Sequence, residues 1–147
     1  MFNFFPESSI ELILPWTPSV NHYYGDRVVK KGGKDIVIKY ITAKGKQYRE
    51  QVKESITNAA LHHCKKHFTD DVRLKIDIVI SSPDRRKRDS SNLLKALEDA
   101  LQHAGVFPDD YQLDVHVIYR NPAWIKKGGQ IDVRLTKIEW PEVKKGA

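Results

Sequence analysis

The chain has 147 residues, 40% of them hydrophobic and 30% charged, which fits one folded domain with a core of its own. Lys and Arg outnumber Asp and Glu by 25 to 19, and the net charge of +6 favours a polyanionic partner. A single cysteine excludes an intramolecular disulfide. No apolar run reaches the roughly 20 residues of a membrane span, and the N-terminal segment lacks the basic start of a signal peptide. We therefore expect a cytoplasmic, globular, basic protein without membrane contact.

Six short apolar segments predict strands, and in four of them (residues 10–14, 72–80, 113–119 and 131–135) apolar residues alternate with polar ones, which is the pattern of half-buried strands. In chain order the segments are residues 10–14, 28–29, 36–38, 72–80, 113–119 and 131–135. Gly32 and Gly33 separate the second segment from the third, which predicts a hairpin. Between the first two strands, residues 15–25 hold two prolines and several aromatic residues, and we expect an ordered loop there.

Two further segments carry apolar residues at helical spacing. The first follows Thr42, whose hydroxyl can cap a helix, and its apolar stripe holds Tyr48, Val52, Ile56, Ala59 and His63. The second spans residues 93–104 and ends at Gly105. The order β-β-β-α-β-α-β-β predicts an α/β (α+β) fold, a small mixed sheet with two main helices. We expect residues 1–147 to form one domain, with its core over about residues 9–139 and a loose tail over residues 140–147.

Four cations stand directly before the second helix: Arg85, Arg86, Lys87 and Arg88. The free N–H groups at the start of a helix add a partial positive charge, so this segment is suited to bind a phosphate group. The alternative is a basic loop that is simply solvated.

Carboxylates flank the same helix, with Asp89 before it and Asp109 and Asp110 after it. Mg²⁺ prefers carboxylate oxygens, and metal-assisted phosphodiester cleavage needs such acids amid basic residues that hold the DNA backbone. Alternatively, Asp89 only caps the helix, and the other two only form a turn. Lys95 lies inside the helix, where it could reach the scissile phosphate or simply pair with Asp99 four residues on.

The segment 83–110 resembles the RusA family of Holliday-junction resolvases. The family pattern is an Arg-rich run, Asp-x-Asp-Asn-x-x-Lys, Asp-Ala-Leu, a glycine and Asp-Asp before a strand. Here it reads Arg88-Asp89-Ser90-Ser91-Asn92-Leu93-Leu94-Lys95, then Asp99-Ala100-Leu101, Gly105 and Asp109-Asp110. The resemblance extends to residues 14–21 and 42–49 and to Lys127-Gly128-Gly129, and covers about residues 9–139.

The resemblance implies a homodimer that binds four-way DNA junctions and nicks two strands symmetrically with Mg²⁺. By position, Asp89 and Asp110 would be catalytic and metal-binding carboxylates, and Lys95 the catalytic lysine. The chain departs from the family at Ser91, where the pattern has its second aspartate. A serine is a neutral metal ligand, or it caps the helix. Three explanations stay open: an inactivated variant made for study, a natural binder without catalysis, or a site completed by Asp99 or Asp109.

Aromatic residues and histidines are further candidates for DNA binding or metal binding. Trp16, Tyr23, Tyr24 and Trp124 lie in predicted loops near basic residues and either stack on unpaired bases or pack, with packing favoured for Trp16. The predicted DNA-binding set is Arg85, Arg86, Lys87, Arg88, Asn92, Tyr23, Tyr24, Lys126 and Lys127. His62, His63, Cys64 and His67 form no closed zinc site, because no second ligand cluster exists. The chain has no GxxxxGK loop, so no nucleotide cofactor is expected.

Two hypotheses follow. The first is a Mg²⁺-dependent, structure-specific endodeoxyribonuclease that acts on branched DNA, with activity weakened or lost at Ser91. The alternative is a non-catalytic protein that binds junction or branched DNA.

Overall fold

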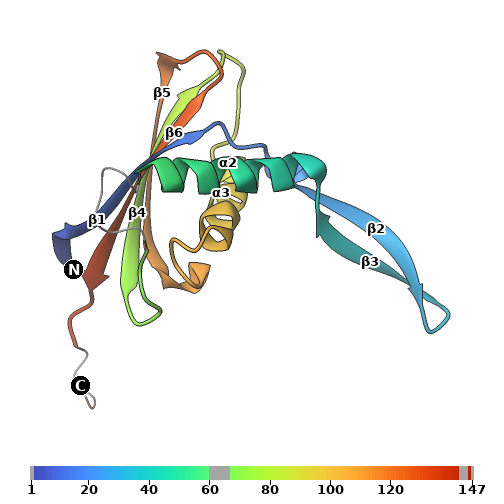
Figure 1. The fold of residues 1–147 in the computed structure, drawn as a ribbon, viewed down its shortest axis with the longest axis horizontal. Coiled ribbons are helices and arrows are strands. Elements are labelled where there is room, and N and C mark those ends of the chain that lie inside the picture. The colour runs from blue at the N-terminus through green and yellow to red at the C-terminus, as the bar shows by residue number, and fades with distance from the viewer. Residues whose placement is uncertain (1, 60–66, 143–145, 147) are drawn as a thin grey trace.

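The computed structural model describes residues 2–59, 67–142 and 146. Its elements are β1 (Asn3–Pro15), α1 (Val20–Tyr23), β2 (Tyr24–Lys31), β3 (Lys34–Ile41), α2 (Ala43–Ala59), β4 (Arg73–Ser82), α3 (Ser91–His103), the 3-10 turn η1 (Asp110–Gln112), β5 (Leu113–Ile125) and β6 (Gln130–Glu139). The predicted α+β fold and the order of strands and main helices are confirmed (Figure 1). Within these residues no helix is both long and apolar enough to cross a membrane.

The main sheet has four strands in the order β1-β6-β4-β5. β4 and β5 run parallel, and the other neighbours are antiparallel. A parallel pair needs a crossover connection, which α3 supplies here. The basic loop therefore leaves one end of β4, and the chain returns along α3 and past η1 to begin β5 at the other end. All the residues singled out between 85 and 110 belong to this one crossover.

α2 and α3 lie over one face of the main sheet (Figure 1). Alternate residues of β4 (Leu74, Ile76, Ile78 and Ile80) are buried there, and α3 adds Leu93, Ala96, Leu97, Ala100 and Leu101. The period of two on the strand and the three-to-four spacing on the helix bring both apolar surfaces into one core. Packing against the sheet thus fixes α3 and the polar side chains on its other faces.

The structure differs from the sequence-based expectation at the ends of several elements. β1 begins at Asn3 and β5 continues to Ile125, well beyond the alternating segments. The hydrogen bonds between strands are made by the backbone alone. An exposed strand end therefore needs no alternation of apolar and polar side chains, and the sequence pattern does not reveal it. The expected loop at residues 15–25 contains α1. The expected helix past Ala59 falls on residues 60–66, so His62, His63 and Cys64 lie outside the described residues.

β2 and β3 form a separate two-stranded hairpin that projects from the body of the molecule (Figure 1). Gly32 and Gly33 connect the strands with φ values of 60° and 76°. Positive φ at both central residues gives a turn whose twist matches that of the strands, and only glycine adopts it freely. The predicted hairpin is confirmed, but it is not part of the main sheet.

Candidate nucleic-acid interface and active site

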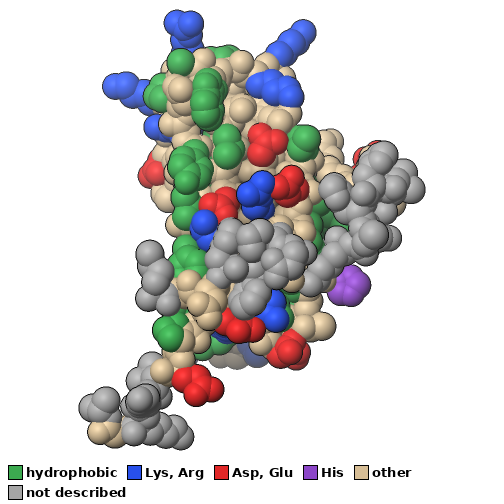
Figure 2. Space-filling view, turned by 90° about the vertical axis from the view of Figure 1, so that its left-hand side faces the viewer, with side chains coloured by type: hydrophobic (Ala, Val, Ile, Leu, Met, Phe, Trp, Pro, Cys, Tyr) green, Lys and Arg blue, Asp and Glu red, His purple; other side chains and the backbone are tan. Residues whose placement is uncertain are grey.

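The basic loop lies where β4 ends. Arg85, Arg86 and Lys87 are exposed. The turn between β5 and β6 lies at the same end, because the Lys126 N–H donates to the Ser82 carbonyl at 2.9 Å, and Lys126 and Lys127 are exposed. Figure 2 shows Lys and Arg side chains projecting from this upper end of the molecule. Two segments 40 residues apart in the chain thus form one basic end.

Arg88 differs from the other cations of the loop. Its guanidinium donates to both carboxylate oxygens of Asp84, at 2.7 and 2.9 Å, and lies 5.6 Å from the centre of the Trp16 ring. The paired Arg88 guanidinium holds the pKa of Asp84 at about 2. Arg120 donates to the Arg88 carbonyl. Arg88 therefore shapes the loop, whereas Arg86 makes only a longer ion pair with Asp84, at 3.7 Å, and has 83% of its side chain exposed. Asp84 and Arg120 were not singled out from the sequence.

Asp89 lies two residues before the first helical residue of α3. Its carboxylate accepts hydrogen bonds from the Ser91 N–H at 3.1 Å and from the Ser91 hydroxyl at 2.8 Å, and these bonds lower its pKa. The N-cap residue of α3 is Ser90 and not Asp89, so the capping alternative for Asp89 is wrong in its position: Asp89 accepts from the first helical N–H from one residue before the cap, and its side chain stays exposed. Ser91 is the first helical residue and its hydroxyl is a donor to Asp89, so the helix-cap interpretation of Ser91 is wrong.

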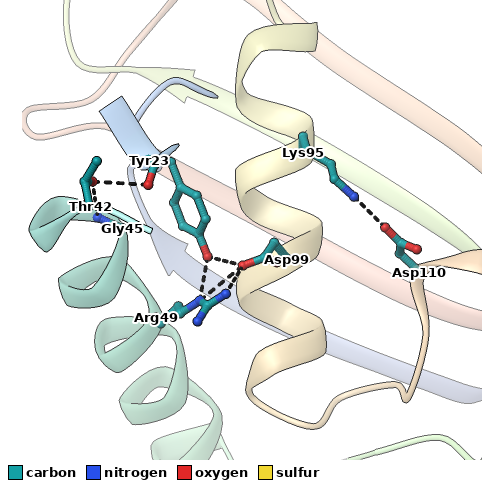
Figure 3. A network of polar contacts seen from close by, with 7 residues as sticks. All are labelled: Tyr23, Thr42, Gly45, Arg49, Lys95, Asp99 and Asp110. Atoms are coloured by element: carbon teal, nitrogen blue, oxygen red, sulfur yellow. Dashed lines mark hydrogen bonds and ion pairs between the residues drawn. The ribbon is translucent and has the colours of Figure 1, made fainter. Parts of the chain in front are cut away.

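Lys95 does not pair with Asp99. Its ammonium group contacts Asp110 at 2.8 Å, between the second turn of α3 and the start of η1 (Figure 3). The hydrogen bond raises the pKa of Lys95 and lowers the pKa of Asp110. Both groups are charged at neutral pH, and 57% of the lysine side chain is exposed. The crossover thus places a cation and a carboxylate side by side at the surface.

Asp99 has other partners. One of its oxygens accepts from Arg49 Nε at 3.1 Å, from Arg49 Nη2 at 2.8 Å and from the Tyr23 hydroxyl (Figure 3). These contacts join α1, α2 and α3 below the Lys95–Asp110 pair. The pairing expected between Lys95 and Asp99 fails because Arg49 reaches Asp99 from the neighbouring helix.

Asp109 has a capping role. Its carboxylate accepts from the Tyr111 N–H at 2.9 Å, and Gln112 closes a capping box on the Asp109 N–H. The turn interpretation of Asp109 is confirmed. Asp99 and Asp109 thus each have intramolecular partners.

The aromatic residues divide by burial. Tyr23 is completely buried, so its prediction as a base-stacking residue is wrong: its ring packs in the core and burial raises its pKa. Trp16 packs against the core, as favoured. Tyr24 is half-buried at the base of the hairpin, and Trp124 is about half exposed.

A surface groove of about 420 Å³ runs beside the start of α3. Its lining includes Lys87, Asp89, Asn92, His22 and Lys44. The groove thus joins the predicted residues Asp89 and Asn92 to the segment 16–22, and adds His22 and Lys44, which the sequence analysis did not select.

Glu98 is a further residue that the sequence does not reveal. It lies one turn after Lys95, is buried, and contacts His116 of β5 at 2.6 Å. Burial is the main cause of its raised pKa. Its position among leucines and alanines on α3 gives no hint of this partner, because β5 lies 15 residues further along the chain.

The side chains predicted to bind metal provide only some of the oxygen ligands that a hard cation such as Mg²⁺ prefers. Asp89 and Asp110 are ionised carboxylates and Ser91 is a neutral hydroxyl. No three Asp, Glu, His or Cys side chains within residues 2–59 and 67–142 gather into a metal-holding group. Mg²⁺ often takes one or two carboxylates and fills its other positions with water and substrate phosphate. These residues therefore fit a Mg²⁺ ion held jointly with substrate better than a permanently bound ion.

Comparison with known proteins identifies relatives over nearly the whole chain. The family model described as "Endodeoxyribonuclease RusA" matches residues 15–136. A crossover junction endodeoxyribonuclease of Enterobacteria phage HK97 is 34% identical over 130 residues, covering 88% of this chain and 95% of the relative. The corresponding protein of Shigella sonnei is 34% identical over 135 residues, covering 89% and 97%. The matched region contains the basic loop, α3 and η1.

Proposed function

Because the chain belongs to the RusA family of endodeoxyribonucleases, we propose that it is a Holliday-junction resolvase. It binds four-way DNA junctions as a homodimer and cuts phosphodiester bonds symmetrically with Mg²⁺. The observation that carries the proposal is the composition of one crossover. Its exposed cations, Arg85, Arg86 and Lys87, are followed by Asp89 just before α3, and Lys95 on the second turn of α3 pairs with Asp110 at the start of η1.

Each group has a chemical task in this proposal. Arg85, Arg86 and Lys87 hold the DNA backbone through its phosphates. Lys95 lies at the surface, where its ammonium group offsets negative charge that develops on the scissile phosphate. Asp89 and Asp110 would hold Mg²⁺, which supplies an activated water and stabilises the leaving oxygen.

Ser91 is the weak point of this site. A hydroxyl in place of a carboxylate removes one negative charge from the neighbourhood of the cation, so we expect weaker Mg²⁺ binding and slower cleavage. The alternative function, a non-catalytic protein that binds branched DNA, is favoured by the same residue. Two further observations favour the non-catalytic function. Asp99 accepts hydrogen bonds from Arg49 and Tyr23, and Asp109 caps η1.

The proposed dimer follows from the reaction. Two opposed strands are cut symmetrically when two copies of one site are related by a two-fold axis. A single crossover per chain supplies one such site, so the second cut requires a second chain.

The experiment is a Mg²⁺-dependent cleavage assay on a labelled four-way junction, with the protein beside Ser91→Asp. Ser90→Asp is the matched control, since it adds the same charge one residue away. We expect Ser91→Asp to cut faster than both. Binding of the junction is measured in Ca²⁺ for all three proteins.

Each outcome separates the two functions. Cleavage by Ser91→Asp alone identifies the scaffold as a resolvase and this chain as its binding form. Equal cleavage by all three proteins shows that Ser91 is tolerated. Junction binding with no cleavage by any of them leaves the non-catalytic function, and the absence of binding refutes both.

A further inference from the structure

The β2–β3 hairpin carries much of the positive charge of the protein. Between residues 24 and 41 there are five cations (Arg27, Lys30, Lys31, Lys34 and Lys39) and two carboxylates (Asp26 and Asp35), a net charge of +3. The chain as a whole carries +6 on 147 residues. Half of the net charge therefore lies on 18 residues that project from the body (Figure 1).

The charge is not evenly compensated along the hairpin. In the strand register Asp26 stands opposite Lys39, and Lys30 stands opposite Asp35. At the tip, Lys31 stands opposite Lys34. Like charges directly opposite each other destabilise a sheet pair, so this tip is unfavourable in the free protein and favourable beside an anion.

The apolar residues of the hairpin have a structural explanation. Val28 stands opposite Val37, and Val29 stands opposite Ile36. Cross-strand pairs of β-branched residues hold a free-standing ribbon together, although Val28 and Val37 are 64% and 66% exposed. The tip turn is open to solvent, since nothing lies within 4 Å of a side chain built on Gly32 or Gly33. The ribbon thus projects from the body and ends in an exposed cationic tip.

The base of the arm adjoins the proposed cleavage site. Tyr24 begins β2, and its ring packs edge-on against Tyr23, whose hydroxyl contacts Asp99 of α3. From Tyr24 the eight residues of β2 extend about 25 Å at roughly 3.3 Å per residue. The tip therefore lies about one strand length from the base of the arm, where Tyr23 contacts Asp99 of α3.

From this arrangement we infer that the β2–β3 hairpin is a DNA-binding arm, whose Lys31 and Lys34 contact phosphates of a junction arm away from the cleavage site. The inference rests on the proposed function, because it takes DNA as the ligand. A two-stranded ribbon fits the major groove of DNA, and a cationic tip is complementary to the phosphate backbone. A second copy of the chain is the less favoured partner of this tip, because Lys31 opposite Lys34 favours an anionic ligand.

The test measures junction binding by K31Q/K34Q over a range of salt concentrations, without cleavage. The matched control is K30Q/D35N, which neutralises the adjacent compensated pair and leaves the net charge unchanged. For K31Q/K34Q we expect about tenfold weaker binding, and a salt slope shallower by about 1.8, from about 0.9 per lost phosphate contact. The control should match the unmodified protein in affinity and in salt slope.

Sedimentation of each protein without DNA completes the experiment. Unchanged junction affinity and salt slope in K31Q/K34Q overturn the DNA-binding arm but leave the proposed function standing. A lower molecular mass for K31Q/K34Q alone shows that the tip contacts a second copy, which also overturns it. If the unmodified protein binds no junction, the proposed function fails first.

Discussion

Lys95 and Asp110 form a 2.8 Å ion pair that joins the second turn of α3 to the turn before β5. Fifteen residues separate them in the chain. The pair holds an ammonium group and a carboxylate in contact, and it raises the pKa of Lys95 and lowers the pKa of Asp110. In the proposed reaction a cation and a carboxylate are needed at the same phosphate, and this contact brings them together before substrate binds.

Asp110→Asn should abolish cleavage without unfolding the protein. In the Ser91→Asp background we expect the rate to fall at least about 100-fold, because the amide is a poor ligand for Mg²⁺. The pair is largely exposed, so its loss should change the free energy of unfolding by less than about 1 kcal/mol. Junction cleavage and thermal melting measure the two effects. Undiminished cleavage would remove Asp110 from the site.

The network around Asp99 should contribute to stability rather than to chemistry. Asp99→Ala leaves the Arg49 guanidinium and the buried Tyr23 hydroxyl without their shared acceptor. We expect a loss of about 1–3 kcal/mol in the free energy of unfolding, measured by urea denaturation. Lys53→Ala, on the exposed side of α2, serves as the control and should cost less than about 0.5 kcal/mol. Equal stability of the two variants would show that the network is not stabilising.

Asp84 should titrate far below an ordinary carboxyl group. Its pKa is about 2 instead of 3.8, because Arg88 donates two hydrogen bonds to the ionised form. A depressed folded pKa stabilises the native state above pH 3.8, and that contribution is lost as the pH falls through about 2. Carboxyl carbon NMR should follow this midpoint in the protein, and Arg88→Gln should return it toward 3.8. A midpoint unaffected by Arg88→Gln would exclude Arg88 as the cause.

Arg86 and Arg88 should affect DNA binding differently, although they are two residues apart. Arg86 is exposed, so Arg86→Gln should reduce the salt slope of junction binding by about 0.9, the value for one phosphate contact. Arg88 is held by Asp84, so D84N/R88Q should leave the slope nearly unchanged. Fluorescence anisotropy at several salt concentrations distinguishes them. Equal losses of slope would show that Arg88 leaves Asp84 when DNA binds.

The order of strands and helices, the hairpin turn and the core of α3 could be predicted from local pattern alone. Alternation on β4, the spacing of leucines on α3 and the Gly32-Gly33 pair each report a conformation set by a few neighbouring residues. The family motif likewise lies in one continuous stretch. For these features the sequence carries the information directly, because the interactions involved span only a few residues.

The partners of the polar side chains depended on tertiary structure. Lys95 pairs with Asp110 and not with Asp99, because α2 brings Arg49 to Asp99 and the chain after α3 folds back along the helix. Tyr23 is buried by the packing of α1 between α2 and α3, and Glu98 finds His116 across the crossover. These contacts join residues 15 to 76 positions apart, and no local pattern encodes such distances. The sequence by itself determined the elements and the family, whereas the packing of helices on the sheet decided which charges meet.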